Sequence, residues 1–389
     1  FFFKQKTAYE IRNCDWSSDV CSSDLLVATG LSRGTRTHPE HAADAVEKAL
    51  ARADLNHANG VLLFLTPDYA RHPEPALRAA ARAGGCLQVV GCTGAGVFTE
   101  QEWILDSPGA AAMVFGGHLR LALPSVAEPE PRPIISLCTP SGLTADWLDA
   151  VVPRIGAVSA DLDGEGPFKV WAGSRVADAG CVETTIDGVS AAIAASQGMR
   201  ALTSPVEVME VQGYDVLRLG NASAWDALTG ALPVAVRKMK RLPLHLIMGG
   251  VTFGDPSTAI RDGRYRLNHI VSANAKEESI TLSHPLDRGE RLFWAMRDAL
   301  AAEREMRAAI ENTRAQLGNE PDFGLLFPCM GRGPNFFGNR DRDLELIKER
   351  FPNLPFVGFY GNGEIGPLAD GNHLYQYSAV MGLFRAHRA

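Results

Sequence analysis

The sequence lacks the features that define several large classes of protein. No apolar run approaches the ~18 residues of a membrane-spanning helix, so we expect no transmembrane segment, and the acidic composition argues against an anionic membrane as a partner. Positive charge is not in excess, because 38 Lys and Arg residues stand against 45 Asp and Glu residues, and the formal net charge is −7. Nucleic acids attract basic surfaces, so we expect no nucleic-acid partner. A cytoplasmic, globular protein is the expectation that remains.

Metal and cofactor motifs are also missing. The seven cysteines form no C-x-x-C pair and the ten histidines form no H-x-x-x-H pair, so the sequence predicts no metal site. No G-x-x-x-x-G-K-[ST] loop is present. Residues 361–366 match G-x-G-x-x-G, but Pro367 follows and no helix opens there, which argues against a dinucleotide site. We therefore expect no cofactor.

The first 25 residues differ from the rest of the chain. They read FFFKQKTAYEIRNCDWSSDVCSSDL, with no hydrophobic period of 2 or 3.6 and none of the regions of a signal peptide. The segment resembles translated sequencing-adapter read-through. We interpret residues 1–25 as a non-native, disordered segment and begin the fold at residue 26.

From residue 26, short apolar strands alternate with helices, which is typical of a mixed α/β fold. We expect helices at about residues 38–52 and 75–83. A longer helix, Ala299–Leu317, is expected to begin after the N-cap residue Asp298 and to end at Gly318.

Two further features concern chain organisation. Residues 111–115 and 119–123 read as consecutive strands of a hairpin joined by two glycines. The spacing of strand candidates changes near residue 203, which predicts two domains, 26–203 and 204–389.

A glycine pattern occurs twice. The motif L-x-x-V-G-x-x-G-x-G spans Leu87–Gly96 and returns at Leu354–Gly363, each time after an apolar strand and a helix. We therefore predict two related sheet-and-helix domains with strand–helix–strand units that end in glycine-rich turns. Such turns bring bare backbone close to a ligand at the carboxyl end of a strand. The alternative is that the glycines only permit a tight turn.

Polar residues near these turns are the candidate site. Arg332 lies between two glycines after a strand, where a guanidinium is suited to hold a carboxylate; the alternative is a surface arginine. Glu364, together with Asn362 and Tyr360, is suited to an ammonium or amide group; the alternative is a solvated loop carboxylate. The candidate ligand-binding residues are Cys92, Thr93, Cys329, Arg332, Asn335, Tyr360, Gly361, Asn362 and Glu364.

Cys329 also supports a different hypothesis. A thiol next to an arginine can have a lowered pKa and act as a nucleophile. Free cysteine is, however, among the most buried residue types, and inert packing is the alternative. We assign no catalytic residue, and an enzyme that uses Cys329 is the second hypothesis.

The motifs resemble a known family. Residues 327–333 (FPCMGRG) and 357–367 (VGFYGNGEIGP) resemble the C-terminal FIST domain, and residues 90–96 (VGCTGAG) are similar to the N-terminal FIST domain. The resemblance covers nearly all of residues 26–385. It implies an intracellular sensory module for signal transduction that binds small ligands such as amino acids. The family also occurs in eukaryotic F-box proteins.

One stretch departs from the family pattern. Residues 164–180, where a further glycine-rich turn is usual, contain only the short sequence WAGS. No kinase, cyclase or methyl-accepting segment is found, so we expect the output to come from a separate signalling protein. The leading hypothesis is a sensor of a small zwitterionic or carboxylated metabolite, and a protein-interaction scaffold is the third.

Overall fold

The computed structural model describes residues 27–125, 132–148, 150–369 and 371–387. The segment interpreted as non-native, residues 1–25, lies outside this described part. The fold class is mixed α/β, as predicted. Among the described residues, no helix is both long enough and apolar enough to cross a membrane.

The first sheet is built around a completely buried strand. In β2 (Gly60–Leu65), Leu62 and Phe64 face the interior between two sheets, while the intervening side chains pack against α1 (Glu40–Arg52) and α2 (Glu74–Gly84). A strand covered on both faces is apolar at every position, as this one is. The first sheet has the order β1-β6-β2-β3-β10-β11, with bounds Val27–Arg33, Gly109–Phe115, Gly60–Leu65, Val89–Thr93, Val170–Ala172 and Arg175–Val176.

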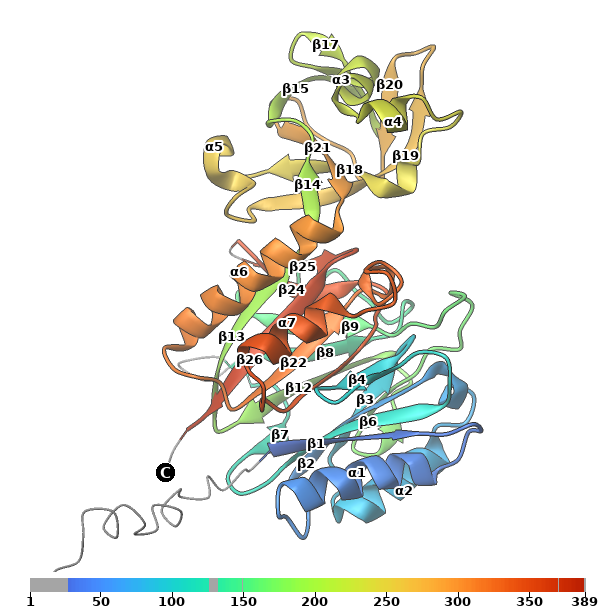
Figure 1. Cartoon of the computed structure of the whole chain (residues 1–389), viewed down its shortest axis with the longest axis vertical. Helices are drawn as coiled ribbons and strands as arrows, with labels where there is room; N and C mark the ends of the chain where they lie inside the picture. The colour runs from blue at the N-terminus through green and yellow to red at the C-terminus, as the bar shows by residue number, and fades with distance from the viewer. Residues whose placement is uncertain (1–26, 126–131, 149, 370, 388–389) are drawn as a thin grey trace, which may run out of the picture.

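The second sheet packs face to face against the first. The Phe64 ring centroid lies 6.1 Å from that of Phe327 and 5.0 Å from that of Phe359. The outer face of the second sheet is covered by α6 (Ala299–Leu317) and α7 (Arg342–Arg350), which gives four layers in the order helix, sheet, sheet, helix (Figure 1). The second sheet has the order β13-β26-β22-β23-β4-β5, with bounds Val189–Ser196, Ala379–Ala386, Phe323–Pro328, Phe356–Phe359, Val97–Thr99 and Trp103–Ile104.

Both predicted strand–helix–strand units are present. The strands β2 and β3 pair in parallel around α2, and β22 and β23 pair in parallel around α7. As predicted, α6 begins after Asp298, whose side chain accepts a hydrogen bond from Ala301 N at 2.8 Å, and it ends at Gly318.

A side sheet closes the same core. It contains a third parallel pair, β8 with β9, which the sequence did not reveal. The predicted hairpin of residues 111–115 and 119–123 is wrong, because β6 pairs with β1 and β2 whereas β7 pairs with β12. The side sheet has the order β25-β24-β9-β8-β12-β7, with bounds Gly371–Tyr375, Glu364–Leu368, Arg154–Val158, Ile134–Cys138, Cys181–Asp187 and Arg120–Ala122.

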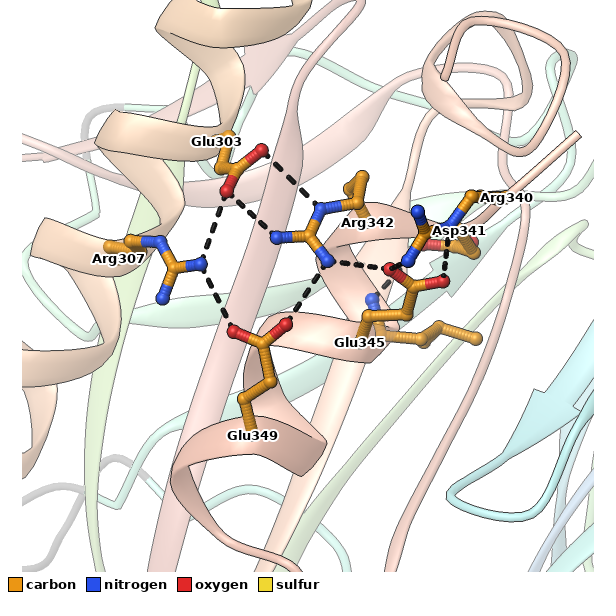
Figure 2. A network of polar contacts seen from close by, with 8 residues as sticks. Glu303, Arg307, Arg340, Asp341, Arg342, Glu345 and Glu349 are labelled. Carbon is orange, nitrogen blue, oxygen red and sulfur yellow. Dashed lines mark hydrogen bonds and ion pairs between the residues drawn. The ribbon is translucent and has the colours of Figure 1, made fainter. Parts of the chain in front are cut away.

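Ion pairs join the two helices on the second sheet. Arg342 at the start of α7 lies 2.7 Å from Glu303 of α6 and also contacts Glu345 and Glu349, while Arg307 of α6 bridges Glu303 and Glu349 (Figure 2). Networks of this kind hold position better than isolated surface pairs do. They fix α7, whose N-cap residue Asp341 and first-turn residue Asp343 are both buried.

Residues 199–297 form an inserted domain at one end of the molecule (Figure 1). Its antiparallel sheet has the order β14-β21-β15-β16-β20-β19-β18, and β17 pairs with β16. The strands span Met199–Ala201, Arg291–Arg297, Val206–Gln212, Asp215–Leu219, Ser279–Leu282, Tyr265–Asn274, Ile247–Thr252 and, for β17, Ala222–Ser223. The helices of this domain are α3 (Ala224–Ala231), α4 (Val234–Arg237) and α5 (Pro256–Ala259), and it contains a short 3₁₀ turn, Leu244–Leu246. Two further 3₁₀ turns, Pro67–Tyr69 and Met330–Arg332, belong to the core.

Strands from both sides of the predicted boundary at residue 203 share the sheets of the core. The strand β13 pairs with β26, β4 pairs with β23, and β9 pairs with β24. The chain leaves this core after Gly198 and returns at Asp298, whose backbone N donates to Gly198 O at 3.2 Å. The two ends of the insertion therefore lie side by side.

This adjacency gives a first prediction. Replacing residues 199–297 by a short Gly-Ser linker should leave a core that unfolds in one cooperative thermal transition, because no core strand is removed. Circular dichroism in the near ultraviolet would measure it. As a control, replacing residues 97–104, which supply β4 and β5, should abolish the transition. Loss of the near-ultraviolet signal after the first replacement would contradict a self-sufficient core.

Candidate functional site

The two glycine-rich turns contact each other. Ala95 N donates to Tyr360 O at 3.0 Å, and Tyr360 N donates to Gly96 O at 2.9 Å. The amides of Gly361 and Asn362 are also used, since they donate to Pro328 O and Val158 O, each at 2.9 Å. These backbone groups satisfy one another and do not form an open cradle for a ligand.

The repeated motif has a packing role. A Cβ atom on Gly91 would lie 1.7 Å from Leu63 O, and one on Gly358 would lie 1.8 Å from Leu326 O. In each unit the glycine is the register partner of that residue on the parallel neighbouring strand. Close approach of the backbone, rather than a ligand, requires glycine at both positions.

Arg332 lies inside the protein and is only 1% exposed. Its Nε and NH2 donate to the two carboxylate oxygens of Asp343 at 2.8 and 3.0 Å. NH1 donates to Ser196 O at 2.6 Å, and NH2 also contacts Ser196 Oγ and Ala302 O. We therefore reassign Arg332 from holding a ligand carboxylate to holding the fold, because its guanidinium is already bound on both sides.

The predicted cluster of Tyr360, Asn362 and Glu364 does not converge. The Tyr360 hydroxyl donates to Asp341 at 2.5 Å behind the second sheet, the Asn362 side chain is exposed, and Glu364 is buried in the core. Burial, followed by the nearby charge of Asp343, raises the pKa of Asp341 to about 7.

The remaining predicted residues are also separated. Asn335 is exposed on the loop before α7, and Gly361 is buried at the bridge to Cys329. Cys92 lies in the main core, where burial raises the pKa of its thiol, and the Thr93 hydroxyl pairs with that of Ser159 at 2.8 Å. None of these side chains forms a ligand site with Arg332.

Cys329 and Glu364 do come together, beside Ser378. The Ser378 hydroxyl donates to Glu364 Oε2 at 2.7 Å, and the Cys329 thiol also hydrogen-bonds this carboxyl group. Burial raises the pKa of Glu364 to about 8, despite these donors. Burial, and then the charge of Glu364, raises the pKa of Cys329 to about 12, so this thiol is protonated near neutral pH and is poorly suited to act as a nucleophile.

Near this cluster, the Tyr377 ring contacts Arg297 and His269. The Arg297 guanidinium lies 4.1 Å above the Tyr377 ring, and it donates to Gly331 O beside Cys329. The other neighbour of Tyr377 is His269 of the inserted domain, at 5.4 Å between ring centroids. His269 belongs to the wall of a cleft.

The cleft has a volume of about 520 Å³ and lies between the inserted domain and the core. One wall is β19 of the inserted domain, from Arg266 to His269, and the opposite wall includes Gln197, His373 and Leu374 of the core. Its size is that of a small-molecule site, and clefts between domains are common locations for such sites.

The cleft collects buried polar atoms that lack partners. The buried side-chain atoms without a hydrogen-bond partner in the described chain include Gln197 Oε1, Arg266 Nε, Asn268 Nδ2 and His269 Nε2, and all four of these residues line the cleft. Asn268 is 1% exposed and Gln197 is 4% exposed. Buried polar atoms normally have a partner, so these four atoms are available to a ligand or to water.

Three histidines line the cleft, and two of them, His269 and His373, have a lowered pKa. Burial lowers the pKa of His269, and burial together with Arg266 and His284 lowers the pKa of His373 to about 4. His284 Nδ1 lies 3.0 Å from Asn268 Oδ1. Within the described residues, no group of three or more His, Cys, Asp or Glu side chains is placed to hold a metal ion.

Sequence reasoning missed this cleft. The histidines that line it are far apart in the sequence, because His269 and His284 belong to the inserted domain whereas His373 belongs to β25 of the core. The one available signal was an unusual number of polar side chains in the strand of residues 265–274.

The Arg332–Asp343 pair generates a stability prediction. Arg332→Leu should lower the free energy of unfolding by about 3–5 kcal/mol, because it leaves the Asp343 carboxylate buried without its partner. The double variant Arg332→Leu/Asp343→Leu should lose less than the two single changes together. Urea unfolding would measure this, with Arg307→Leu on the exposed face of α6 as the matched control. An effect of Arg332→Leu no larger than the control would contradict a structural role.

Glu364 generates a prediction about pH. Its pKa is higher in the folded protein than the ordinary value of 4.5, so its contribution to stability is full below that value and is lost as pH rises toward about 8. Glu364→Gln keeps the shape without the titration. Its stability relative to the wild type should therefore rise by on the order of 1–3 kcal/mol between about pH 5 and pH 8. Thermal unfolding of the wild type and of both variants at the two pH values would measure this change. The control Glu165→Gln, at an exposed position, should not show it. If Glu364→Gln and Glu165→Gln change equally with pH, the raised pKa of Glu364 is contradicted.

Two family models match consecutive parts of this chain. The sequence model of the FIST N domain matches residues 59–222, and that of the FIST C domain matches residues 214–367. An uncharacterized protein of Mycobacterium tuberculosis (strain ATCC 25618 / H37Rv) is 27% identical over 248 residues, which are 63% of this chain and 65% of that protein. The chain thus spans slightly less than two thirds of this relative.

A shorter match links the chain to a eukaryotic protein. F-box only protein 22 of Homo sapiens is 34% identical over 77 residues, which are 18% of each chain. FIST domains are associated with signal transduction and small-ligand sensing. Because the two matching models together cover residues 59–367, this chain belongs to the FIST domain family.

Proposed function

We propose that this protein is a cytoplasmic sensory module that binds a small amino-acid-like metabolite in the cleft between the inserted domain and the core. The observation that carries the proposal is the group of four unpaired, buried polar atoms that line this cleft. The proposed ligand is the zwitterionic or carboxylated metabolite expected from the sequence. The proposed binding site is the cleft and not the glycine-rich turns.

The polar atoms match the two ends of an amino acid. Arg266 Nε and Asn268 Nδ2 are donors suited to a carboxylate, and the positive charge of Arg266 is shared with Glu290, to which its Nη2 donates at 2.7 Å. Gln197 Oε1 is an acceptor suited to an ammonium group, and its orientation is fixed because Gln197 Nε2 donates to Tyr265 O at 3.2 Å. His269 Nε2 donates or accepts according to its tautomer.

The apolar part of the cleft suits an aliphatic side chain. Leu148, Leu267, Pro285 and Leu374 line it beside the polar atoms. Most small-molecule sites combine such an apolar surface with a few placed polar groups, which orient the ligand. A ligand here would touch the core through Gln197 and the inserted domain through β19.

Contact with both parts provides a route for signalling. The inserted domain joins the core through β14 and β21, which pair with each other directly after Gly198 and before Asp298. A ligand that binds both walls favours the arrangement in which the walls lie close. We propose that a separate signalling protein reads this change. An enzyme based on Cys329 is not proposed, because its thiol is buried and protonated.

Calorimetry against the twenty amino acids tests the proposal. At least one should bind the wild type, and Asn268→Asp should weaken binding by about tenfold or more, since it replaces a donor by a carboxylate that repels the ligand carboxylate. Asn312→Asp makes the same chemical change in a neighbouring cavity and should leave the affinity unchanged. If none of the twenty binds, or if a bound ligand ignores Asn268→Asp, the proposal fails.

A further inference from the structure

Two cysteines on neighbouring strands of the side sheet face each other. Cys138 of β8 and Cys181 of β12 are register partners, and their Sγ atoms lie 2.6 Å apart. The cysteines are free thiols in this structure. Neither thiol takes part in the cleft chemistry proposed above.

The strand register suits a covalent bond between them. Thr139 N donates to Gly180 O at 2.6 Å, so the next pair along the strands is the hydrogen-bonded one. Cys138 and Cys181 therefore form a non-hydrogen-bonded pair, in which Cα atoms lie about 4.5 Å apart. Disulfides span Cα separations of about 4.4–6.8 Å, so no backbone movement is required.

The two thiols differ in environment. Cys138 is completely buried, whereas Cys181 is partly exposed. The hydrogen bond from Cys138 lowers the pKa of Cys181, the charge of Arg154 lowers it further, and burial and Glu183 oppose these effects. A partly exposed thiol of lowered pKa beside a buried thiol is the arrangement of an attacking and a resolving cysteine.

We propose that Cys138 and Cys181 form a redox modification site. Hydroperoxides oxidise the two thiols to a disulfide, and small thiols reduce this disulfide again. The Cys181 thiolate attacks one oxygen of the hydroperoxide, the O–O bond breaks, and the sulfur becomes a sulfenic acid while an alcohol or water leaves. Cys138 then attacks this sulfur, the S–S bond forms and water leaves. Both sulfurs are oxidised by one electron each, and the peroxide is reduced by two electrons.

The pair lies behind one wall of the cleft. Cys138 and Cys181 share an apolar cluster with Trp147, Leu148 and Leu374, and the two leucines line the cleft. Oxidation therefore acts on the packing that supports this wall. The inference goes beyond the proposed function and does not depend on it, because disulfide formation is measured without any ligand.

Peptide mapping after oxidation tests the proposal. The full chain in a Cys14→Ser/Cys21→Ser background is treated with hydrogen peroxide, the free thiols are alkylated, and the protein is digested with trypsin. Arg154, Lys169 and Arg175 separate the two cysteines, so the expected product is a cross-linked pair of peptides that dithiothreitol separates again. The denatured protein should lose two of its five remaining thiols.

Variants distinguish this pair from other cysteines. Cys181→Ser and Cys138→Ser should each abolish the cross-link, whereas Cys329→Ser should keep it. Cys92 needs its own control, because its charge also contributes to the raised pKa of Cys138; the cross-link should persist in Cys92→Ala. If the protein with all five remaining cysteines gives no Cys138–Cys181 peptide, or joins Cys138 to Cys92, the inference is overturned. This measurement does not depend on whether the single-cysteine variants fold.

Discussion

The structure depends on one buried ion pair at the junction of its parts. Arg332 follows β22 of the core and binds Asp343 of α7, Ser196 at the end of β13 and Ala302 of α6. The inserted domain leaves the core directly after β13 and returns directly before α6. A planar guanidinium with five donors can hold three such elements at fixed angles, which a lysine could not do. Next to Ser196, the backbone N of Gln197 donates to the carboxylate of Glu305 of α6 at 2.9 Å.

The position of the Arg332 charge explains the pKa values of the buried carboxyl groups around it. Asp343 is paired and accepts two donors from Arg332, whereas Asp341 and Glu364 have no cation at hydrogen-bond distance in the described chain. Burial therefore raises the pKa values of Asp341 and Glu364, while hydroxyl groups of Tyr360 and Ser378 satisfy their oxygens. Shifted carboxyl groups are often taken as signs of a site. Here they belong to the packing of the core, where the Arg332 guanidinium is committed to Asp343.

Local patterns predicted the elements, and long-range contacts determined their roles. The α6 helix was predicted with its Asp298 cap and Gly318 end, because capping is encoded within a few residues. The glycine repeat was also recognised, since it marks the two strand–helix–strand units. Its reason was hidden, because Gly358 is required by a carbonyl of Leu326, more than 30 positions earlier in the chain. For Arg332, the sequence predicted a ligand-binding or surface side chain, because its partners Asp343 and Ser196 are not adjacent to it in the chain.

The duplicated units also explain where ligand recognition can occur. In a single open α/β sheet, the carboxyl ends of the strands are free to bind ligands. Here the two turns at those ends bind each other, and β4 extends from one turn to pair with β23 of the other unit. The contact between the two units therefore occupies the strand ends at which each unit alone could bind a ligand. The unpaired polar atoms lie instead where β19 of the inserted domain meets the core, and the proposed ligand site is therefore outside the repeat.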